Sequence, residues 1–228
     1  MSPRTRKPLT RDKVLSKAIK LADAGGFESL SMRKLAKELG VEAMSLYNHV
    51  ANKEDILDGI VDIVFSEIEF PSPGETDWKT AMRQRAISAR EALGRHSWAV
   101  GLMENRNPGP ANLRHHNDVM GCLREAGFSF RTAVHAYSVL DAYTYGFALQ
   151  EHTLPFDNAE ELSVVMERRR RKIPEMQEYP YLIEVATELE KDGYDYATEF
   201  GIGLELILDG LKGLHDPKTR ERLHGKQR

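Results

Sequence analysis

The chain has 228 residues, of which 41% are hydrophobic, 29% charged and 8% aromatic. This composition excludes a disordered or collagen-like chain, and the length fits one domain or a small domain followed by a larger one. The single cysteine, Cys122, excludes an intrachain disulfide and a zinc site built from cysteines. Because neither a membrane-spanning apolar run nor a signal peptide is recognisable, we expect a cytoplasmic protein without membrane contact.

The charges are divided unevenly along the chain. The formal net charge is −3, but residues 1–53 hold eleven Lys and Arg against five Asp and Glu, a net charge of +6, and the remainder carries −9. A basic segment on an acidic body indicates a polyanionic partner for that segment, because phosphate neutralisation dominates non-specific nucleic-acid binding. By charge alone, a basic tail that only improves solubility fits equally well.

Apolar residues recur with the helical period almost throughout, and no segment shows the alternation typical of strands. Polar caps and Gly or Pro breaks mark the ends of the segments. The predicted helices run from Thr10 to Gly25, Ser31 to Leu39, Glu42 or Ala43 to Val50, Lys53 to Ile68, Asp77 to Arg95, His96 to Met103, Ala111 to Ala126, Ser129 to Glu151, Asp157 or Asn158 to Lys172, Pro180 to Lys191, and Tyr194 to Leu214. The chain is therefore predicted to be all-α.

Two short helices meet in residues 31–50. Ala36 lets them approach each other, Gly40 permits a sharp turn, and Leu46 returns to a core shared with Leu39. A helix-turn-helix requires small, turn-forming and apolar residues at this spacing, because its second helix must project from a small core to enter the major groove. Together with the basic charge, the pattern predicts a DNA-binding domain, with an ordinary helical hairpin as the alternative.

The same segment resembles the DNA-binding domain of the tetracycline-repressor (TetR) family. The likeness rests on GFESLSMRKLAKELGV at residues 26–41, SLYNHV at 45–50 and NKEDIL at 52–57. It continues into the body, for example in YGFAL at residues 145–149. The expected organisation is a basic arm over residues 1–9, a helix-turn-helix DNA-binding domain with its connecting helix over 10–68, and a C-terminal effector-binding and dimerisation domain over 75–216.

Side chains on the second and third helices are candidates for contact with duplex DNA. Ser31 caps its helix and leaves backbone N–H groups and a hydroxyl for a phosphate. Arg33 is long enough to pair with a guanine edge. The exposed start and face of the third helix, where the side chains suit thymine methyl groups and an adenine, consist of Ala43, Met44, Ser45 and Asn48.

Three further positions match family residues that hold the DNA backbone. The resemblance assigns this role to Tyr47, His49 and Lys53, which are all capable donors. For Tyr47 and His49, partial burial in the core of the DNA-binding domain is the alternative. The arm residues 4–7 either lie along the duplex or its minor groove, or make no contact.

The body is expected to form a homodimer. A DNA-binding domain of this size binds weakly alone, and two copies about one helical turn apart read a palindrome. Residues 129–151 and 194–214 carry apolar side chains on more than one face, which indicates burial on two sides. In the resembled family, the corresponding helices form a four-helix bundle with their mates. Burial inside one large monomer core is the alternative.

A small-molecule effector is expected to bind the body, because a mostly apolar cavity with a few placed polar groups is typical of ligand sites. The candidate polar groups and walls are Met82, Arg85, Met103, Arg106, Met120, His135, Asp141, Tyr145 and Gln150. The positions that hold drug and magnesium in tetracycline-binding family members correspond to Glu69, Arg85, Ala89, about Met103, and Gln150. Because magnesium prefers anionic oxygen and Gln150 is an amide, we expect an effector other than magnesium-tetracycline.

No motif indicates catalysis. Neither a Gly-rich phosphate loop, a nucleophile elbow nor a His-Glu-x-x-His sequence occurs. His115 and His116 are adjacent and so point in different directions, which does not suit two ligands of one metal. We expect no catalytic residue, metal or cofactor, and a ligand-responsive repressor of a palindromic operator. The alternatives are a DNA-binding regulator whose body docks a protein partner, and an enzyme with its site in the helical body.

Overall fold

The computed structural model describes residues 8–72, 74–156, 158–173, 178–192 and 195–215. Helices and turns make up these residues, and apart from an isolated bridge between Asn158 and Asp195 they contain no β-structure, which confirms the all-α prediction. The α-helices are α1 (Arg11–Gly25), α2 (Met32–Leu39), α3 (Ala43–Leu46), α4 (Lys53–Ser66), α5 (Trp78–Arg95), α6 (Pro110–Glu125), α7 (Phe130–Thr153), α8 (Ala159–Lys172), α9 (Pro180–Asp192) and α10 (Tyr196–Lys212). Within the described ranges, none of the helices is long and apolar enough to cross a membrane.

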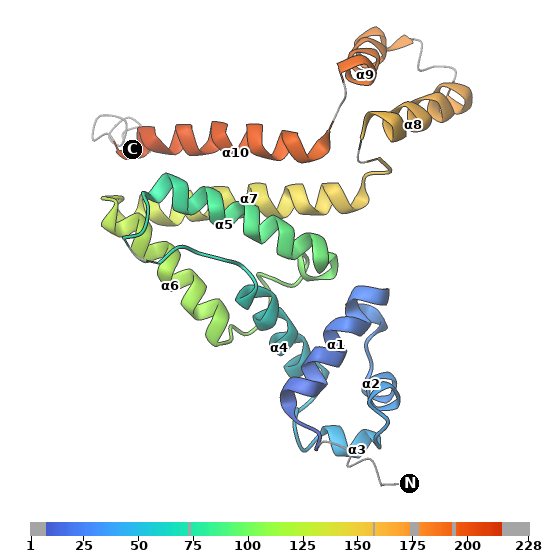
Figure 1. The fold of residues 1–228 in the computed structure, drawn as a ribbon, viewed down its shortest axis with the longest axis vertical. Helices are drawn as coiled ribbons and strands as arrows, with labels where there is room; N and C mark the ends of the chain where they lie inside the picture. The colour runs from blue at the N-terminus through green and yellow to red at the C-terminus, as the bar shows by residue number, and fades with distance from the viewer. Residues whose placement is uncertain (1–7, 73, 157, 174–177, 193–194, 216–228) are drawn as a thin grey trace, which may run out of the picture. The chain divides into compact units, whose positions relative to one another are not determined.

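The helices form two compact units. The first ends at Tyr137 and the second begins at Ser138, so that α7 contributes to both. The boundary between the two units, at residues 137 and 138, lies well after residues 71–74. The sequence predicts the start of the C-terminal domain directly after those residues. Within the first unit, α4 leads from the group of α1, α2 and α3 to α5 and α6 (Figure 1).

The predicted caps begin the first helices. The side chains of Thr10 and Ser31 accept hydrogen bonds from the backbone N–H groups of Lys13 and Lys34, at 3.3 and 3.2 Å. Gly40 ends α2 with a φ of 66°, a left-handed conformation that glycine adopts without the clash of a Cβ atom. These local signals therefore set the helix boundaries where the sequence places them.

Two predicted helices are much shorter in the structure. α3 ends at Leu46 rather than Val50, because the N–H groups of His49 and Val50 both donate to the Leu46 carbonyl in a tight turn that leads to α4. The helix predicted from His96 to Met103 is only a 3-10 turn over Ser97–Ala99. The His96 ring, which precedes this turn, lies within hydrogen-bond distance of the distant carboxylates of Asp23 and Glu67.

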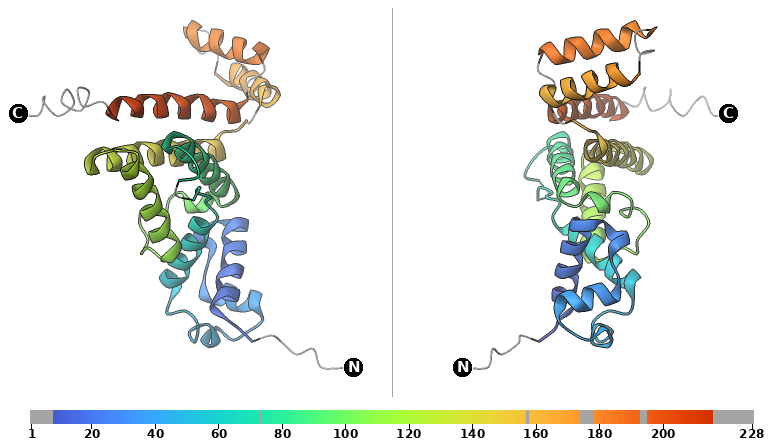
Figure 2. Two further views of the ribbon diagram at one scale, coloured as in Figure 1. Left: turned by 60° about the vertical axis from the view of Figure 1, so that its left-hand side comes forward. Right: turned by 90° about the vertical axis from the view of Figure 1, so that its right-hand side faces the viewer.

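The second unit consists of the end of α7, the pair α8 and α9, and α10. Both views of Figure 2 show α8 and α9 side by side, and Leu162, Met166 and Ala186 form the core between them. The aromatic rings of Phe147 and Tyr196 stack at 4.5 Å between centroids and join α7 to α10. Asp157, Tyr194, the arm at residues 4–7 and residue 216 lie outside the described residues.

Candidate nucleic-acid interface and ligand pocket

The outward side of α3 carries side chains that the rest of the protein leaves uncovered. Met44 is 75% exposed, whereas Leu46 and Val50, on the inward side, are 0% and 3% exposed. Ala43 and Ser45 are half-buried, and Asn48 is exposed. Together, α3 and the turn after it bury Leu46 and Val50 and present a methionine and an amide to solvent, which is the arrangement that major-groove recognition requires.

The residues predicted to hold the DNA backbone lie around this helix. Ser31, the N-cap of α2, and Arg33, within α2, are exposed. Tyr47 is 47% exposed, and His49 and Lys53 are half-buried. For Tyr47 and His49, the structure thus combines partial burial with access to solvent. The role of the nine predicted residues in DNA contact stays a prediction.

An ion pair fixes the turn that follows α3. Arg11 of α1 donates to both carboxylate oxygens of Asp55, at 2.9 and 2.6 Å, and Asp55 also accepts the backbone N–H of Ala51 at 2.8 Å. The hydrogen bond from Arg11 holds the pKa of Asp55 below its usual value. This pair positions the turn at residues 47–51, and the sequence gives no signal for it because 44 residues separate the partners.

A second polar cluster joins α1 to the end of α4 and the segment after α5. Both ring nitrogens of His96 face carboxylates, Nδ1 at 2.7 Å from Asp23 and Nε2 at 3.2 Å from Glu67. Trp98 Nε1 donates to the same Asp23 oxygen at 2.7 Å. The helices α1 and α4 are therefore attached to the segment after α5 through buried rings as well as through the covalent chain.

The outer face of α4 holds the segment before α6. Glu54, Asp58 and Asp62 recur at four-residue intervals along α4. Arg106 pairs with Glu54 and Asp58, and Asp62 accepts the backbone N–H of Asn112 at 2.8 Å, at the start of α6. Arg106, predicted to bind an effector, thus serves in this structure as a link between α4 and the body.

A buried polar cluster lies among α5, α6 and the start of α7. Arg85, only 1% exposed, donates from Nε to Nε2 of His115 at 2.8 Å, and its guanidinium carbon lies 5.2 Å from the ring centroid of Tyr137. Burial first and the charge of Arg85 second lower the pKa of His115 to about 3. His115 is therefore neutral at physiological pH, and its Nε2 accepts the hydrogen bond that Arg85 donates.

The other predicted effector residues differ widely in exposure. Met82, Met103 and Asp141 are buried, Met120 and Tyr145 are half-buried, and His135 and Gln150 are exposed. Gln150 accepts a hydrogen bond from the Tyr196 hydroxyl at 2.9 Å. Their assignment to one effector site stays a prediction.

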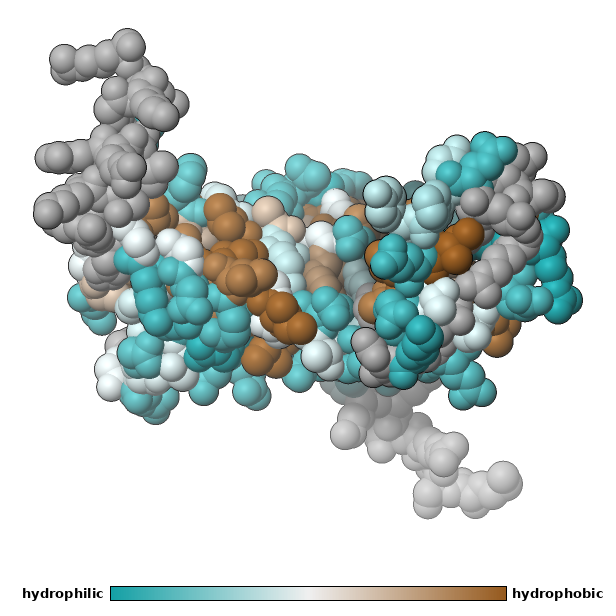
Figure 3. Space-filling model, turned by 90° about the horizontal axis from the view of Figure 1, so that it is seen from above, coloured by the Kyte–Doolittle hydropathy of each residue, from teal (hydrophilic) through white to brown (hydrophobic). Residues whose placement is uncertain are grey.

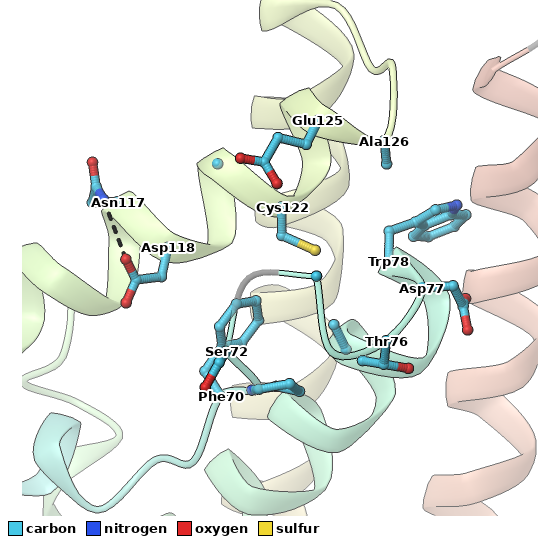
Figure 4. A pocket seen from close by; sticks show the side chains of 14 residues that line it. Phe70, Ser72, Thr76, Asp77, Trp78, Asn117, Asp118, Cys122, Glu125 and Ala126 are labelled. Carbon is cyan, nitrogen blue, oxygen red and sulfur yellow. Dashed lines mark hydrogen bonds between the residues drawn. The ribbon is translucent and has the colours of Figure 1, made fainter.

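A well-formed pocket lies within the first unit, between the segment that precedes α5 and the outer face of α6 (Figure 4). Its volume is about 420 Å³, within the range of small-molecule sites. None of the nine predicted effector residues lines it. We call it the α5–α6 pocket, and its walls are Phe70, Pro71, Ser72, Gly74, Thr76, Asp77, Trp78, Ala81, Asn117, Asp118, Gly121, Cys122, Glu125 and Ala126.

Comparisons with known proteins cover both parts of the chain. Residues 14–60 match the family described as "Bacterial regulatory proteins, tetR family", and residues 70–214 match "Tetracyclin repressor-like, C-terminal domain". A "HTH-type transcriptional regulator" of Saccharopolyspora erythraea is 33% identical over 210 residues, which are 91% of this chain and 86% of that protein. The tetracycline repressor protein class D of Escherichia coli is 30% identical over 209 residues, or 90% and 89% of the two chains.

Solved structures agree with the sequence matches. ActR of Streptomyces coelicolor, a TetR family protein solved in complex with actinorhodin, superposes with a TM-score of 0.73 at 29% identity and covers 91% of this chain and 99% of its own. The family matches and the relatives together span the helix-turn-helix and the helical body. The chain therefore belongs to the tetracycline-repressor (TetR) family of bacterial transcriptional regulators.

Proposed function

We propose that this regulator is a ligand-responsive repressor, which binds a palindromic operator as a homodimer and is released by a small molecule other than magnesium-tetracycline. Membership of a family of transcriptional regulators confirms that the chain is not an enzyme. The observation that carries the proposal is the outward surface of α3 and of the turn after it, where Met44 and Asn48 are exposed while Leu46 is buried. Such a face fits base edges and thymine methyl groups in the major groove.

Exposed apolar side chains in the second unit support the homodimer. Val139 and Leu149 on α7, and Ile202 and Leu206 on α10, are exposed large hydrophobic residues. Apolar side chains are visible among polar ones on the side of the molecule shown in Figure 3. An apolar face that one chain leaves uncovered is stabilised when a second copy buries it, and a two-fold dimer presents two recognition helices to a palindrome.

The solved relatives support a small-molecule effector. ActR has been solved with (S)-DNPA and with actinorhodin. In this chain, the amide of Gln150 and the buried guanidinium of Arg85 stand where the resemblance places drug and magnesium contacts, and an amide is a weak substitute for an anionic magnesium ligand. No group of three or more His, Cys, Asp or Glu side chains suited to a metal ion occurs within the described ranges.

The mechanism would act through α4. An effector that favours one arrangement of the body changes the position of α4, which the ion pairs of Arg106 and the hydrogen bonds of Asp62 connect to the start of α6. A coupling free energy of about 1 to 3 kcal/mol lowers operator affinity roughly 5- to 150-fold. Two recognition helices held at a different separation no longer fit successive major grooves.

Selection from a random DNA pool by the purified protein, followed by sequencing, tests the proposal. We expect a palindromic site with half-sites about one helical turn apart, and loss of binding when a candidate effector is added. Selection of single half-sites, or no enrichment, would contradict the proposed dimeric repressor. Release by a protein partner in the absence of any small molecule would instead favour the alternative in which the body docks a protein.

The prediction about magnesium-tetracycline has its own test. We expect the thermal unfolding midpoint to be the same with tetracycline alone and with tetracycline plus magnesium, because Gln150 replaces an anionic ligand. The tetracycline repressor of class D serves as the positive control for the assay. A rise in the midpoint of this chain that depends on magnesium would overturn the prediction.

A further inference from the structure

The α5–α6 pocket combines carboxylates with aromatic walls. Asp118 and Glu125 extend from the same side of α6 as Cys122, which lies one turn from each. Phe70 and Trp78 supply rings on the opposite wall (Figure 4). The described residues that line the pocket include no Lys, Arg or His, so its formal charge is negative.

One carboxylate of the pocket, that of Asp77, already accepts hydrogen bonds within the protein. Asp77 accepts hydrogen bonds from the backbone N–H groups of Lys79 and Thr80, at 3.0 and 3.2 Å, and from the Thr80 hydroxyl at 2.6 Å. Asp77 therefore caps α5, and its contribution to the pocket is mainly the electrostatic effect of its negative charge. The other two carboxylates are Asp118, which accepts one hydrogen bond from the Asn117 amide at 3.2 Å, and Glu125, which is exposed.

The thiol of Cys122 lies beside these carboxylates, and its pKa responds to the charge of two of them. In Figure 4, the Cys122 sulfur points into the pocket. Burial raises the pKa of Cys122, and the negative charges of Glu125 and Asp77 raise it further. Burial disfavours a charge of either sign, whereas the carboxylates of Glu125 and Asp77 favour a positive charge in this pocket.

We propose that the α5–α6 pocket binds an organic cation, an ammonium group carried on an aromatic or other apolar skeleton. Asp118 and Glu125 would hold the ammonium by charge-assisted hydrogen bonds, and Phe70 and Trp78 would pack against the skeleton. With a volume of about 420 Å³, the pocket accommodates a bicyclic ring system. The site is additional to the predicted effector residues, and the proposal does not depend on binding to DNA.

Protection of Cys122 from alkylation tests the proposal with three matched probes. Naphthalen-1-ylmethylamine is a cation, naphthalen-1-ylmethanol is its neutral counterpart, and 1-naphthylacetate is an anion of similar shape. Because Cys122 is the only cysteine of the chain, iodoacetamide incorporation reports on this pocket alone. We expect the amine to slow alkylation at a concentration about tenfold lower than the alcohol requires, and the anion to protect least.

Isosteric variants identify the groups responsible. The double variant Asp118→Asn with Glu125→Gln should remove the preference for the amine over the alcohol while the alcohol still protects. The matched control Glu104→Gln neutralises an exposed carboxylate outside the pocket and should keep the preference. Protection is expressed relative to the unliganded rate of each variant, because loss of the Glu125 charge also changes the reactivity of the thiol.

Three results would overturn the proposal. Equal protection by the amine and the alcohol would show a site without charge selectivity. An amine preference that survives in the double variant would place the cation elsewhere. Absence of protection by any probe at millimolar concentration, with an unchanged thermal midpoint, would show that the pocket does not bind such a molecule.

Discussion

At the scale of single residues, His115 shows how burial sets a protonation state. Its ring is buried, accepts a hydrogen bond from Nε of Arg85 and has a pKa of about 3. In the unfolded chain, the same imidazole titrates near pH 6.5. Because the folded pKa is the lower one, His115 stabilises the fold above pH 6.5, and this stabilisation is lost as the pH falls toward 3.

The variant His115→Gln should therefore reduce the acid sensitivity of the protein. Between pH 7 and pH 5, the histidine accounts for a loss of about 2 kcal/mol in the free energy of unfolding, and a glutamine, which does not titrate, removes this loss. Urea denaturation at both pH values measures the difference. The control His135→Gln replaces an exposed imidazole and should keep the wild-type difference. An unchanged pH dependence in His115→Gln would show that the buried ring is not responsible.

Arg33 and Lys53 are expected to contribute differently to DNA binding. Arg33→Ala should weaken binding to the selected operator by about 1 to 3 kcal/mol and relax the preference at one base pair, because the guanidinium reads a base edge. Lys53→Ala should weaken all sequences alike, because an ammonium on a phosphate carries no sequence information. Fluorescence anisotropy titrations with operator and random duplexes measure both effects. Equal losses on both duplexes for both variants would contradict this division of roles.

At the scale of helices, the contact between α4 and α6 depends on a glycine. Gly109 is the residue before α6, and as a glycine it has no side chain that could cap the helix. Asp62 of α4 instead accepts hydrogen bonds from the first backbone N–H groups of α6. A Cβ atom at Gly109 would lie 2.3 Å from the carboxylate carbon of Asp62. A side chain at position 109 therefore fits only if the Asp62 carboxylate moves away from the start of α6.

Gly109→Ala should therefore lower the free energy of unfolding by about 1 to 3 kcal/mol, because the Asp62 side chain must move and release the start of α6. Gly94→Ala is the matched control, since nothing lies within 4 Å of a Cβ atom there and the position is in the last turn of α5. This control should be neutral or about 0.5 kcal/mol more stable. Urea denaturation distinguishes the two, and equal stability of the variants would show that the contact is not restrictive.

At the scale of the whole molecule, the exposed apolar residues of α7 and α10 determine the expected assembly. Ile202 is 53% and Leu206 71% exposed, one turn apart on α10, whereas Leu204 and Leu208 on the same helix are buried. An amphipathic helix buries one stripe, and α10 carries a second apolar stripe that the single chain leaves in water. A second copy of the chain would cover it.

Leu206→Glu should convert the proposed dimer into a monomer, because a carboxylate in the centre of an apolar interface remains unpaired. Sedimentation equilibrium at micromolar concentration measures the mass. Leu113→Glu, at another exposed leucine on α6, is the control and should leave the dimer intact. A dimer that persists in Leu206→Glu would place the interface elsewhere.

The sequence by itself determined the class of the fold and most helix boundaries. Caps such as Thr10 and Ser31, and the turn glycine Gly40, act within a few residues, so they are readable along the chain. The exposed face of α3 also follows from local periodicity, because Leu46 turns inward and Met44 outward. The family resemblance rested on these same local features.

Only the tertiary structure decided which distant groups meet. Arg11 and Asp55, or His96 with Asp23 and Glu67, are far apart in the sequence, and no periodicity connects them. Where the sequence predicts a helix at residues 96–103, the structure has a 3-10 turn over Ser97–Ala99. A pocket such as the one beside Cys122 forms where separate segments fail to pack completely, and such a gap is a property of three-dimensional packing rather than of local preference.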